Sequence, residues 1–216
     1  MALKWLLFDL DGTLIDSKKC VFTVYTRLFN ELGIAIPSDD EMRSFIGPPI
    51  EETIIKYIKD TNVTKYCNRF REIYSSLDLK ENNRLFDDVP KMLKILKDEG
   101  YKLAICSTKN YKFMGQILEL LGIDKFFELT AGSNPGKKII SKTDVLNDAI
   151  ERGIDINSCL LIGDTIFDVE GAVNAKIPVA IVNYGFGNKE DFVNQNIVWF
   201  CDTVMEIVDK VHSTKI

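Results

Sequence analysis

The strongest constraint on the fold of this chain lies near its start, where an apolar run stops at two aspartates. The run covers Trp5 to Phe8, and the sequence that follows it directly is Asp9-Leu10-Asp11-Gly12-Thr13. Four apolar residues are too few for a helix, and aspartate with glycine favours a turn, so the run predicts a buried strand that leads into a turn. The two carboxylates therefore stand at the end of a core strand.

Asp9 and Asp11 are candidates for binding a metal ion. Side chains alternate between the two faces of a strand, so both carboxylates are expected on one side, separated by two strand rises of about 3.3 Å. Two like charges held that close need a proton or a cation between them, and carboxylate oxygens suit Mg²⁺. Gly12 permits a tight turn, and Thr13 offers a hydroxyl and an N–H to an anion.

Short apolar strands alternate with amphipathic helices over the second half of the chain. The expected strands cover residues 102–106, 127–131, 158–162 and 179–182. This alternation is typical of a doubly wound parallel sheet with helices on both faces, which is an α/β fold. Ligands of such sheets bind beyond the carboxyl ends of the strands, so the residues at those ends form the candidate site.

Between the first strand and the later strands, residues 17–83 show only helical patterns. Apolar residues recur there at helical spacing, with no alternation typical of strands. We therefore predict a small all-helical cap domain, residues 17–83, inserted after the first strand of a catalytic core made of residues 1–16 and 84–216. Hinges are expected near Asp16-Ser17 and around residues 82–87, where polar residues flank the core.

The composition is that of a soluble globular protein without a field of positive charge. The chain has 216 residues, of which 46% are hydrophobic and 27% charged, and its net charge is −5. Nucleic acid and anionic membranes are therefore not expected partners, and no apolar run approaches the roughly 20 residues of a membrane span. Five cysteines without a pairing pattern are expected to be reduced. We expect a cytoplasmic protein that is a monomer or a weak homodimer.

Polar residues suited to phosphate or metal chemistry follow the later strands as well. Ser107 and Thr108 follow the second expected strand, Lys142 opens an expected helix, and Asp164 follows another strand. Each has an ordinary alternative, since serine caps helices, lysine lies on surfaces and aspartate occupies turns. Their joint placement at one edge of the sheet favours a common site.

The stretch from Leu6 to Ser17 resembles the first motif of the haloacid dehalogenase superfamily of phosphatases and phosphomutases. In that family the first aspartate is the nucleophile that becomes a phospho-aspartate, and the second is the general acid and base. The resemblance assigns these roles to Asp9 and Asp11. Because the dehalogenase branch lacks the second aspartate, Asp11 favours phosphoryl transfer over carbon–halogen cleavage.

Three later motifs resemble those of the same family in order and spacing. Ser107 matches the residue whose hydroxyl binds the transferring phosphoryl group, with Thr108 beside it. Lys142 matches the lysine that offsets negative charge, and Lys137 and Lys138 are rivals for that role. We favour Lys142 because it opens a helix, whose positive N-terminal end would also face the phosphate.

The resemblance implies that Mg²⁺ is the cofactor. Asp164 matches the direct ligand of the fourth motif, and Asp168, one helical turn later, is a second or outer ligand. Asp9 and the backbone carbonyl at Asp11 complete the expected ligand set. In the expected cap, Gly47 begins a Gly-Pro-Pro sequence that faces the active site and substrate in the phosphoglycolate-phosphatase-like branch. A rigid turn between cap helices remains the alternative.

The implied function is magnesium-dependent hydrolysis of a small phosphorylated metabolite, as in phosphoglycolate phosphatases. The sequence from Tyr184 to Gly187 resembles a loop of that branch, although a plain glycine loop explains it equally well. A sugar phosphomutase would use the same residues and pass the phosphoryl group from Asp9 to a second acceptor. A phospho-accepting receiver domain is the non-enzyme alternative, but it needs no helical insert and no Asp-Gly-Thr after its accepting aspartate.

Overall fold

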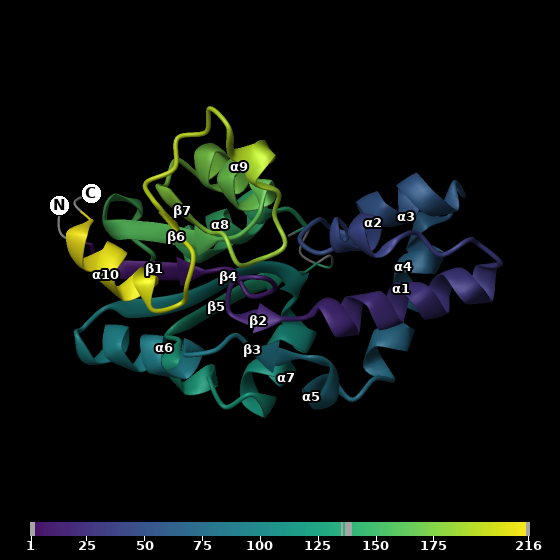
Figure 1. The fold of residues 1–216 in the computed structure, drawn as a ribbon, viewed down its shortest axis with the longest axis horizontal. Coiled ribbons are helices and arrows are strands. Elements are labelled where there is room, and N and C mark those ends of the chain that lie inside the picture. The colour runs from purple at the N-terminus through teal and green to yellow at the C-terminus, as the bar shows by residue number, and fades with distance from the viewer. Residues whose placement is uncertain (1–2, 135, 137–139, 215–216) are drawn as a thin grey trace.

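A buried parallel sheet with strand β1 near its centre organises the fold (Figure 1). The computed structural model describes residues 3–134, 136 and 140–214. Within them the strand order is β5-β4-β1-β6-β7-β8, and every neighbouring pair is parallel. The strands are β1 (Trp5–Phe8), β4 (Lys102–Asn110), β5 (Leu129–Ser133), β6 (Cys159–Gly163), β7 (Val179–Val182) and β8 (Phe200–Cys201). The predicted doubly wound α/β sheet is confirmed.

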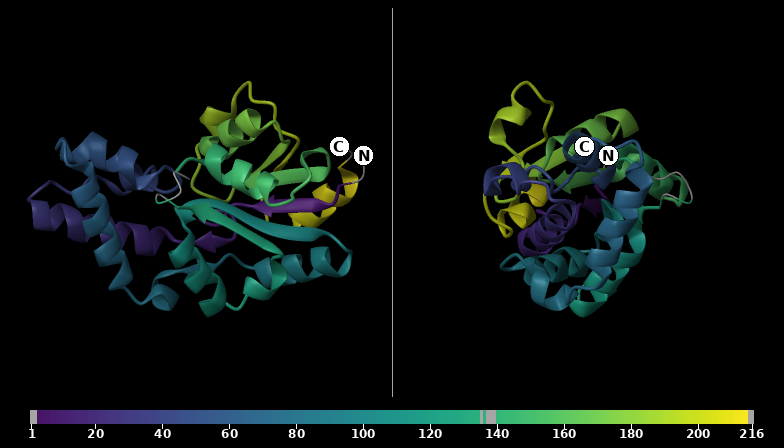
Figure 2. Two further views of the ribbon diagram at one scale, coloured as in Figure 1. Left: turned by 180° about the vertical axis from the view of Figure 1, so that it is seen from behind. Right: turned by 90° about the vertical axis from the view of Figure 1, so that its right-hand side faces the viewer.

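Helices cover both faces of this sheet, as Figures 1 and 2 show. Leu6 and Phe8 of β1 belong to one apolar cluster and Leu7 to the other, because successive side chains of a strand point to opposite faces. Among the helices that contribute to the first cluster, α6 (Val89–Asp98), α7 (Tyr111–Leu120) and α10 (Glu206–Ser213) cover the sheet. Those of the second are α8 (Lys142–Glu151) and α9 (Ile166–Ala175). Burial on both faces explains why the strands read as continuous apolar runs.

The segment after β1 forms five helices; the last lies beside α7, and the other four extend beyond one end of the sheet, on the right of Figure 1. The five are α1 (Lys18–Leu32), α2 (Asp39–Arg43), α3 (Ile50–Ile58), α4 (Val63–Ser75) and α5 (Leu79–Asn82), and we call them the cap helices. Gly33 ends α1 in a left-handed conformation, and Ser38 and Glu41 form a reciprocal capping box at α2. The segment is helical as predicted. Its behaviour as a separate domain, with the boundaries given above, stays a prediction.

The two connections between the cap helices and the sheet form a small structure that the sequence patterns do not reveal. Strand β2 (Ile15–Asp16) pairs antiparallel with β3 (Arg84–Leu85), and Arg84 Nη2 lies 2.8 Å from Asp16 Oδ2. Strands of two residues are too short to show a period, so the sequence does not predict them. The predicted hinge residues are thus tied to each other across the base of the cap helices.

Other sequence predictions differ from the structure only in detail. Strand β4 continues past its expected end to Asn110, with a change of register between Ser107 and Asn110, and the edge strand β8 is an addition. The five cysteines are buried and form no disulfide, as expected. Among the described helices, none combines the length and the apolar character that crossing a membrane requires.

Candidate active site

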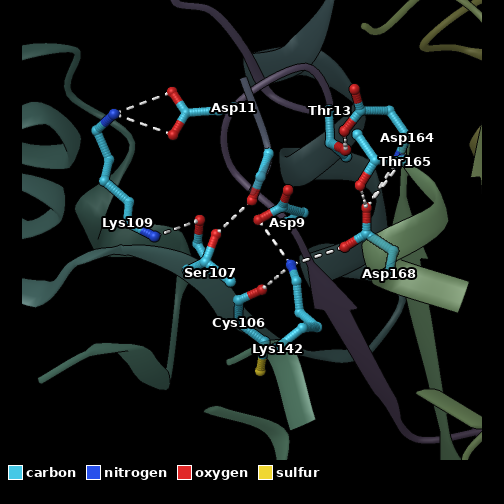
Figure 3. A network of polar contacts seen from close by, with 12 residues as sticks. Asp9, Asp11, Thr13, Cys106, Ser107, Lys109, Lys142, Asp164, Thr165 and Asp168 are labelled. Atoms are coloured by element: carbon cyan, nitrogen blue, oxygen red, sulfur yellow. Dashed lines mark hydrogen bonds and ion pairs between the residues drawn. The ribbon is translucent and has the colours of Figure 1, made fainter. Parts of the chain in front are cut away.

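The polar residues predicted at the strand ends do come together (Figure 3). Asp9 follows β1, Ser107 lies on β4, Asp164 follows β6, and Lys142 and Asp168 lie in the first turns of α8 and α9. We call these five residues the polar floor. Each is at most 5% exposed, although polar side chains rarely lie inside a protein without a functional or structural reason. The prediction that one edge of the sheet carries a common site is supported by this arrangement.

Lys142 is the positive centre of the polar floor. Its Nζ lies 2.9 Å from Asp9 Oδ1 and 2.7 Å from Asp168 Oδ1, at ion-pair distance but without the angles of a hydrogen bond. It also donates a hydrogen bond of 2.9 Å to the carbonyl of Cys106. Burial by itself lowers the pKa of Lys142, but the two carboxylates outweigh burial and raise it, so this lysine stays charged.

The carboxylate of Asp164 is held in place by both hydrogen bonds and close backbone packing. Its Oδ2 accepts from the backbone N–H of Phe186 at 2.7 Å, and its Oδ1 accepts from the Thr13 hydroxyl at 3.2 Å. A Cβ built on Gly12 would lie 2.0 Å from Asp164 Oδ2, and one built on Gly185 would lie 2.3 Å from Asp164 Cβ. Burial, with the neighbouring Asp168 and Asp9, raises the pKa of Asp164 well above its ordinary value.

The Asp168 carboxylate contacts both the local backbone and Lys142. Its Oδ2 accepts from the Thr165 hydroxyl and N–H at 2.9 and 3.0 Å and from the Asp164 N–H at 3.2 Å, which caps the start of α9. One carboxylate oxygen is therefore satisfied by the protein, and the other faces Lys142. This arrangement fits the predicted outer or second-ligand role better than that of a principal metal ligand.

Asp9, Asp164 and Asp168 fit a divalent cation. One oxygen from each carboxylate lies within 4.8 Å of the others, and all three residues are buried. Burial raises the pKa of Asp9 to about 6, while Lys142 opposes this shift and Asp168 and Asp11 reinforce it. Hard oxygen ligands whose ionised forms repel each other are the donor set that Mg²⁺ stabilises. The residues present thus suit magnesium.

Asp11 lies apart from this cluster, which differs from the expected pairing with Asp9. Its two carboxylate oxygens accept hydrogen bonds of 3.0 and 2.9 Å from Lys109 Nζ. The strand ends at Phe8, so the side-chain alternation that predicts a pair does not extend to Asp11. Within the described chain the carboxylate of Asp11 is therefore no part of the candidate metal cluster, and only its backbone carbonyl remains as the predicted ligand.

Lys109 is the functional candidate that the sequence did not single out. It is 8% exposed in its side chain, and its Nζ lies 5.1 Å from the ring centroid of Tyr74 in α4. Burial lowers its pKa, but Asp11 and Tyr74 outweigh burial, so the pKa of Lys109 is raised. Its position two residues after Ser107 was a signal available in the sequence.

The predicted phosphate-binding hydroxyls have protein partners in this structure. The Thr13 hydroxyl donates to Asp164 and its N–H to the Leu10 carbonyl, while the Thr108 hydroxyl donates to the Gly47 carbonyl at 2.9 Å. Ser107 Oγ accepts from the Lys109 N–H at 3.3 Å, and its own hydroxyl donates to none of the described residues. The roles of Thr13 and Thr108 as phosphate ligands stay predictions. Lys137 and Lys138, the rivals of Lys142, lie outside the described residues.

A pocket lies between the polar floor and the cap helices. The chain segment after α2 contributes Phe45, Ile46 and Gly47 to its lining, and the core contributes Asp9, Asp11, Ser107, Thr108 and Lys109. Gly47 has φ of 112°, and a Cβ on it would lie 3.1 Å from Thr165 Cγ2. Gly47 therefore permits a backbone conformation that other residues rarely adopt, and it lets the cap segment approach the core closely. Both features agree with the rigid-turn alternative. Its predicted role in substrate binding is supported only by its place in the pocket wall.

Arg43 of α2 makes a second contact between the cap helices and the site. Its Nη2 donates to the Gly185 carbonyl at 2.6 Å and its Nε to the Phe186 carbonyl at 3.3 Å. The same loop donates the Phe186 N–H to Asp164 and the Tyr184 hydroxyl to the Thr13 carbonyl. The Tyr184 to Gly187 loop is thus more than a plain glycine turn. No local pattern at Arg43 signals a contact across 142 residues of sequence.

Known proteins resemble this chain in sequence and in fold. A family model described as haloacid dehalogenase-like hydrolase matches residues 6–182. The phosphoglycolate phosphatase of Aquifex aeolicus is 31% identical over 182 residues, which is 84% of this chain and 85% of that protein. A solved structure described as a predicted phosphatase from Clostridium acetobutylicum has a TM-score of 0.93 and 28% identity, and covers 99% of this chain and 100% of its own.

Another relative, whose name gives a different activity, is about as similar in sequence as the phosphoglycolate phosphatase. The tyrosine-protein kinase PtkA of Mycobacterium tuberculosis is 30% identical over 190 residues, which is 88% of this chain. The match spans 65% of the kinase, so this chain corresponds to less than two thirds of that protein. The family model nevertheless covers most of this chain, and its first matched residues are those of β1. The chain belongs to the haloacid dehalogenase-like hydrolase family.

Proposed function

We propose that this protein is a magnesium-dependent phosphatase that hydrolyses small phosphomonoesters through a phospho-aspartate at Asp9. The observation that supports it most is the buried grouping of Asp9 with Lys142, Asp164 and Asp168 beside a pocket. A relative named phosphoglycolate phosphatase supports the same class of reaction. The proposal covers small phosphomonoesters in general, of which phosphoglycolate is one.

In the first half of the reaction the Asp9 carboxylate attacks phosphorus, and the bond from phosphorus to the alcohol oxygen breaks. Lys142, 2.9 Å from Asp9, offsets the repulsion between the carboxylate and a phosphate dianion. Magnesium bound by Asp9 and Asp164, with Asp168 beside them, would add positive charge at the same oxygens. Asp11 donates a proton to the departing alcohol oxygen, and Ser107 donates its hydroxyl hydrogen to a phosphoryl oxygen.

In the second half a water molecule attacks the phosphorus of the phospho-aspartate. Asp11 takes a proton from that water, the bond to Asp9 breaks, and phosphate leaves. Lys109 holds both oxygens of Asp11 in this structure, so Asp11 must release one of them to reach either the alcohol or the water. We assign to Lys109 the role of positioning Asp11 between these steps.

Transfer to an organic acceptor is the alternative within the same family. A mutase would use the same residues, and the kinase-named relative shows that a protein similar to this one carries a name for transfer to tyrosine. A mutase or a kinase would differ from a phosphatase only in the molecule that attacks the phospho-aspartate or in the molecule that donates the phosphoryl group. Incubation of a labelled phosphomonoester with a second alcohol separates them, since a phosphatase sends the label to inorganic phosphate.

The proposal is tested by phosphate release from a panel of phosphomonoesters, with Mg²⁺ and with EDTA. We expect release that requires the metal and that falls at least about 10³-fold in Asp9→Asn, because an amide does not attack phosphorus. Asp98→Asn is the matched control, since Asp98 is exposed and pairs only with Lys94 among the described salt bridges. Folded Asp9→Asn protein with near-normal turnover would exclude Asp9 as the nucleophile.

A further inference from the structure

Aromatic side chains form part of the pocket lining. Five of them line the pocket, and we call them the aromatic wall: Tyr25 of α1, Phe45 after α2, Phe70 and Tyr74 of α4, and Phe113 of α7. The ring centroids of Tyr25 lie 5.0 Å from those of Phe45 and 4.9 Å from those of Phe70, and Tyr74 and Phe113 are 4.6 Å apart. Rings at this spacing form a nearly continuous apolar surface.

The positive charges of the described pocket lining already have carboxylate partners. Lys109 is held by both oxygens of Asp11, and Arg71 lies 3.1 Å from Glu51 Oε1. These are the two cationic side chains among the described lining residues. Lys142, below them, is paired with Asp9 and Asp168. Among the described lining residues, a second anionic group on a substrate could pair with a cation only by displacing Glu51 from Arg71 or Asp11 from Lys109.

We infer that the preferred substrates are phosphomonoesters whose alcohol carries an aromatic or similarly flat apolar group, with the phosphoryl group at Asp9 and the apolar group against the aromatic wall. This inference rests on the proposed phosphatase function. A planar apolar group gains contact with the rings and does not compete with Glu51 for Arg71 or with Asp11 for Lys109. A substrate such as 2-phosphoglycolate offers the wall no apolar surface and brings a carboxylate that finds no unpaired cation in the described lining.

Three substrates separate these possibilities when kcat/KM is measured at one Mg²⁺ concentration. Benzyl phosphate carries a ring, ethyl phosphate has a small apolar group, and 2-phosphoglycolate has a second charge. All three release aliphatic alcohols. None is a phenyl ester, so none has a leaving group made more reactive by a ring bonded directly to the ester oxygen. We expect kcat/KM for benzyl phosphate to exceed both others by about tenfold or more.

Variants of two half-buried phenylalanines test whether the aromatic wall is responsible. Phe113→Leu removes a ring from the wall and should lower the ratio of kcat/KM for benzyl phosphate to kcat/KM for ethyl phosphate by about threefold or more. Phe127→Leu is the matched control, because Phe127 is also half-buried but does not line the pocket. Equal selectivity changes in both variants would overturn the assignment to the wall.

The outcomes also distinguish this inference from the function on which it rests. Metal-dependent release from ethyl phosphate and 2-phosphoglycolate, with kcat/KM for 2-phosphoglycolate equal to or above that for benzyl phosphate, would overturn the substrate preference and leave the phosphatase. No release from any of the three substrates or from acetyl phosphate would overturn both. A clear preference for benzyl phosphate that Phe113→Leu reduces supports both.

Discussion

The polar floor, of which Asp9 and Ser107 line the pocket, and the aromatic wall are held together by different interactions. In the floor, Lys142 lies within 2.9 Å of two carboxylates, and a Cβ on Gly185 would overlap Asp164. In the wall, ring centroids lie about 5 Å apart and contacts have no single partner. Charges fixed in position suit one reaction on any phosphoryl group, whereas packed rings suit the choice among alcohols. Reaction and selectivity should therefore respond to different substitutions.

The largest effect should come from the centre of the floor. Lys142→Met keeps the length of the side chain but removes the charge, so we expect kcat to fall about 10²- to 10³-fold for every phosphomonoester alike. Asp9 and Asp168 also lose their buried partner, which should lower the free energy of unfolding by about 3 kcal/mol. Turnover of benzyl and ethyl phosphate checks the fall in kcat, and thermal unfolding checks the loss of stability. A loss confined to one substrate would contradict the separation of floor from wall.

The next largest effect should come from the packing around Asp164. Gly185→Ala places a Cβ 2.3 Å from Asp164 Cβ, so the carboxylate must move away from its hydrogen bond with Phe186. We expect about tenfold or greater loss of kcat/KM and a higher Mg²⁺ concentration for half-maximal rate. Gly115→Ala on α7 is the control, since a Cβ there meets nothing within 4 Å. An unchanged magnesium dependence in Gly185→Ala would show that this loop does not position the metal ligand.

The floor was more predictable from the sequence than the wall. Asp9, Ser107, Lys142 and Asp164 each adjoin the end of an apolar strand or the start of a helix, so the topology alone brings them together. Helical spacing of aromatic residues predicts a buried face but not what it is buried against. Phe70 and Tyr74 are examples, since the pattern does not reveal that they line a pocket opposite the floor.

Contacts between distant segments could not be predicted from the sequence either, because local sequence patterns do not show which segments meet. The pairing of Asp11 with Lys109 depends on how β4 continues past Cys106, and the β2 and β3 pairing involves only two residues on each side. Neither leaves a period or a turn signal. The family resemblance pointed to side chains at the strand ends, and the structure brings those side chains together, but the resemblance did not indicate which cation lies beside each carboxylate.

Titration of the floor carboxylates should change the free energy of unfolding by an intermediate amount, and the aromatic wall should not contribute to this pH dependence. The pKa of Asp9 is raised to about 6 in the folded protein from 3.8, so the folded state holds its proton more tightly than the unfolded state. The stability associated with this group is complete below about pH 4 and is lost as pH rises through 6, by at most about 3 kcal/mol. Asp164, whose pKa is also raised, acts in the same direction.

Mg²⁺ favours the ionised carboxylates and should therefore oppose this loss. We expect Mg²⁺ to raise the melting temperature more at pH 7.5 than at pH 5, relative to EDTA. Asp9→Asn should reduce that difference, because the amide does not titrate. A magnesium effect that is the same at both pH values would place the cation away from Asp9.

The smallest effect should come from the contact that links the two regions. Arg43 of α2 donates to the carbonyls of Gly185 and Phe186, and the Phe186 N–H in turn donates to Asp164. Arg43 is exposed, so its hydrogen bonds compete with water, and we expect Arg43→Ala to cost about 1 kcal/mol, or about fivefold in kcat/KM. Arg43→Lys should restore part of this loss because it keeps one donor.

Arg69→Ala is the control for Arg43→Ala, because Arg69 is also an exposed cap arginine but pairs with Glu31 and Glu72 within the cap helices. If Arg43 positions the loop that holds Asp164, its removal should raise the Mg²⁺ concentration for half-maximal rate, and Arg69→Ala should not. The loss should also be the same for benzyl and ethyl phosphate, since Arg43 touches the loop beside the floor and lies outside the aromatic wall. A loss that depends on the substrate would instead mean that the cap contact acts by shaping the wall, and the two regions would then be coupled.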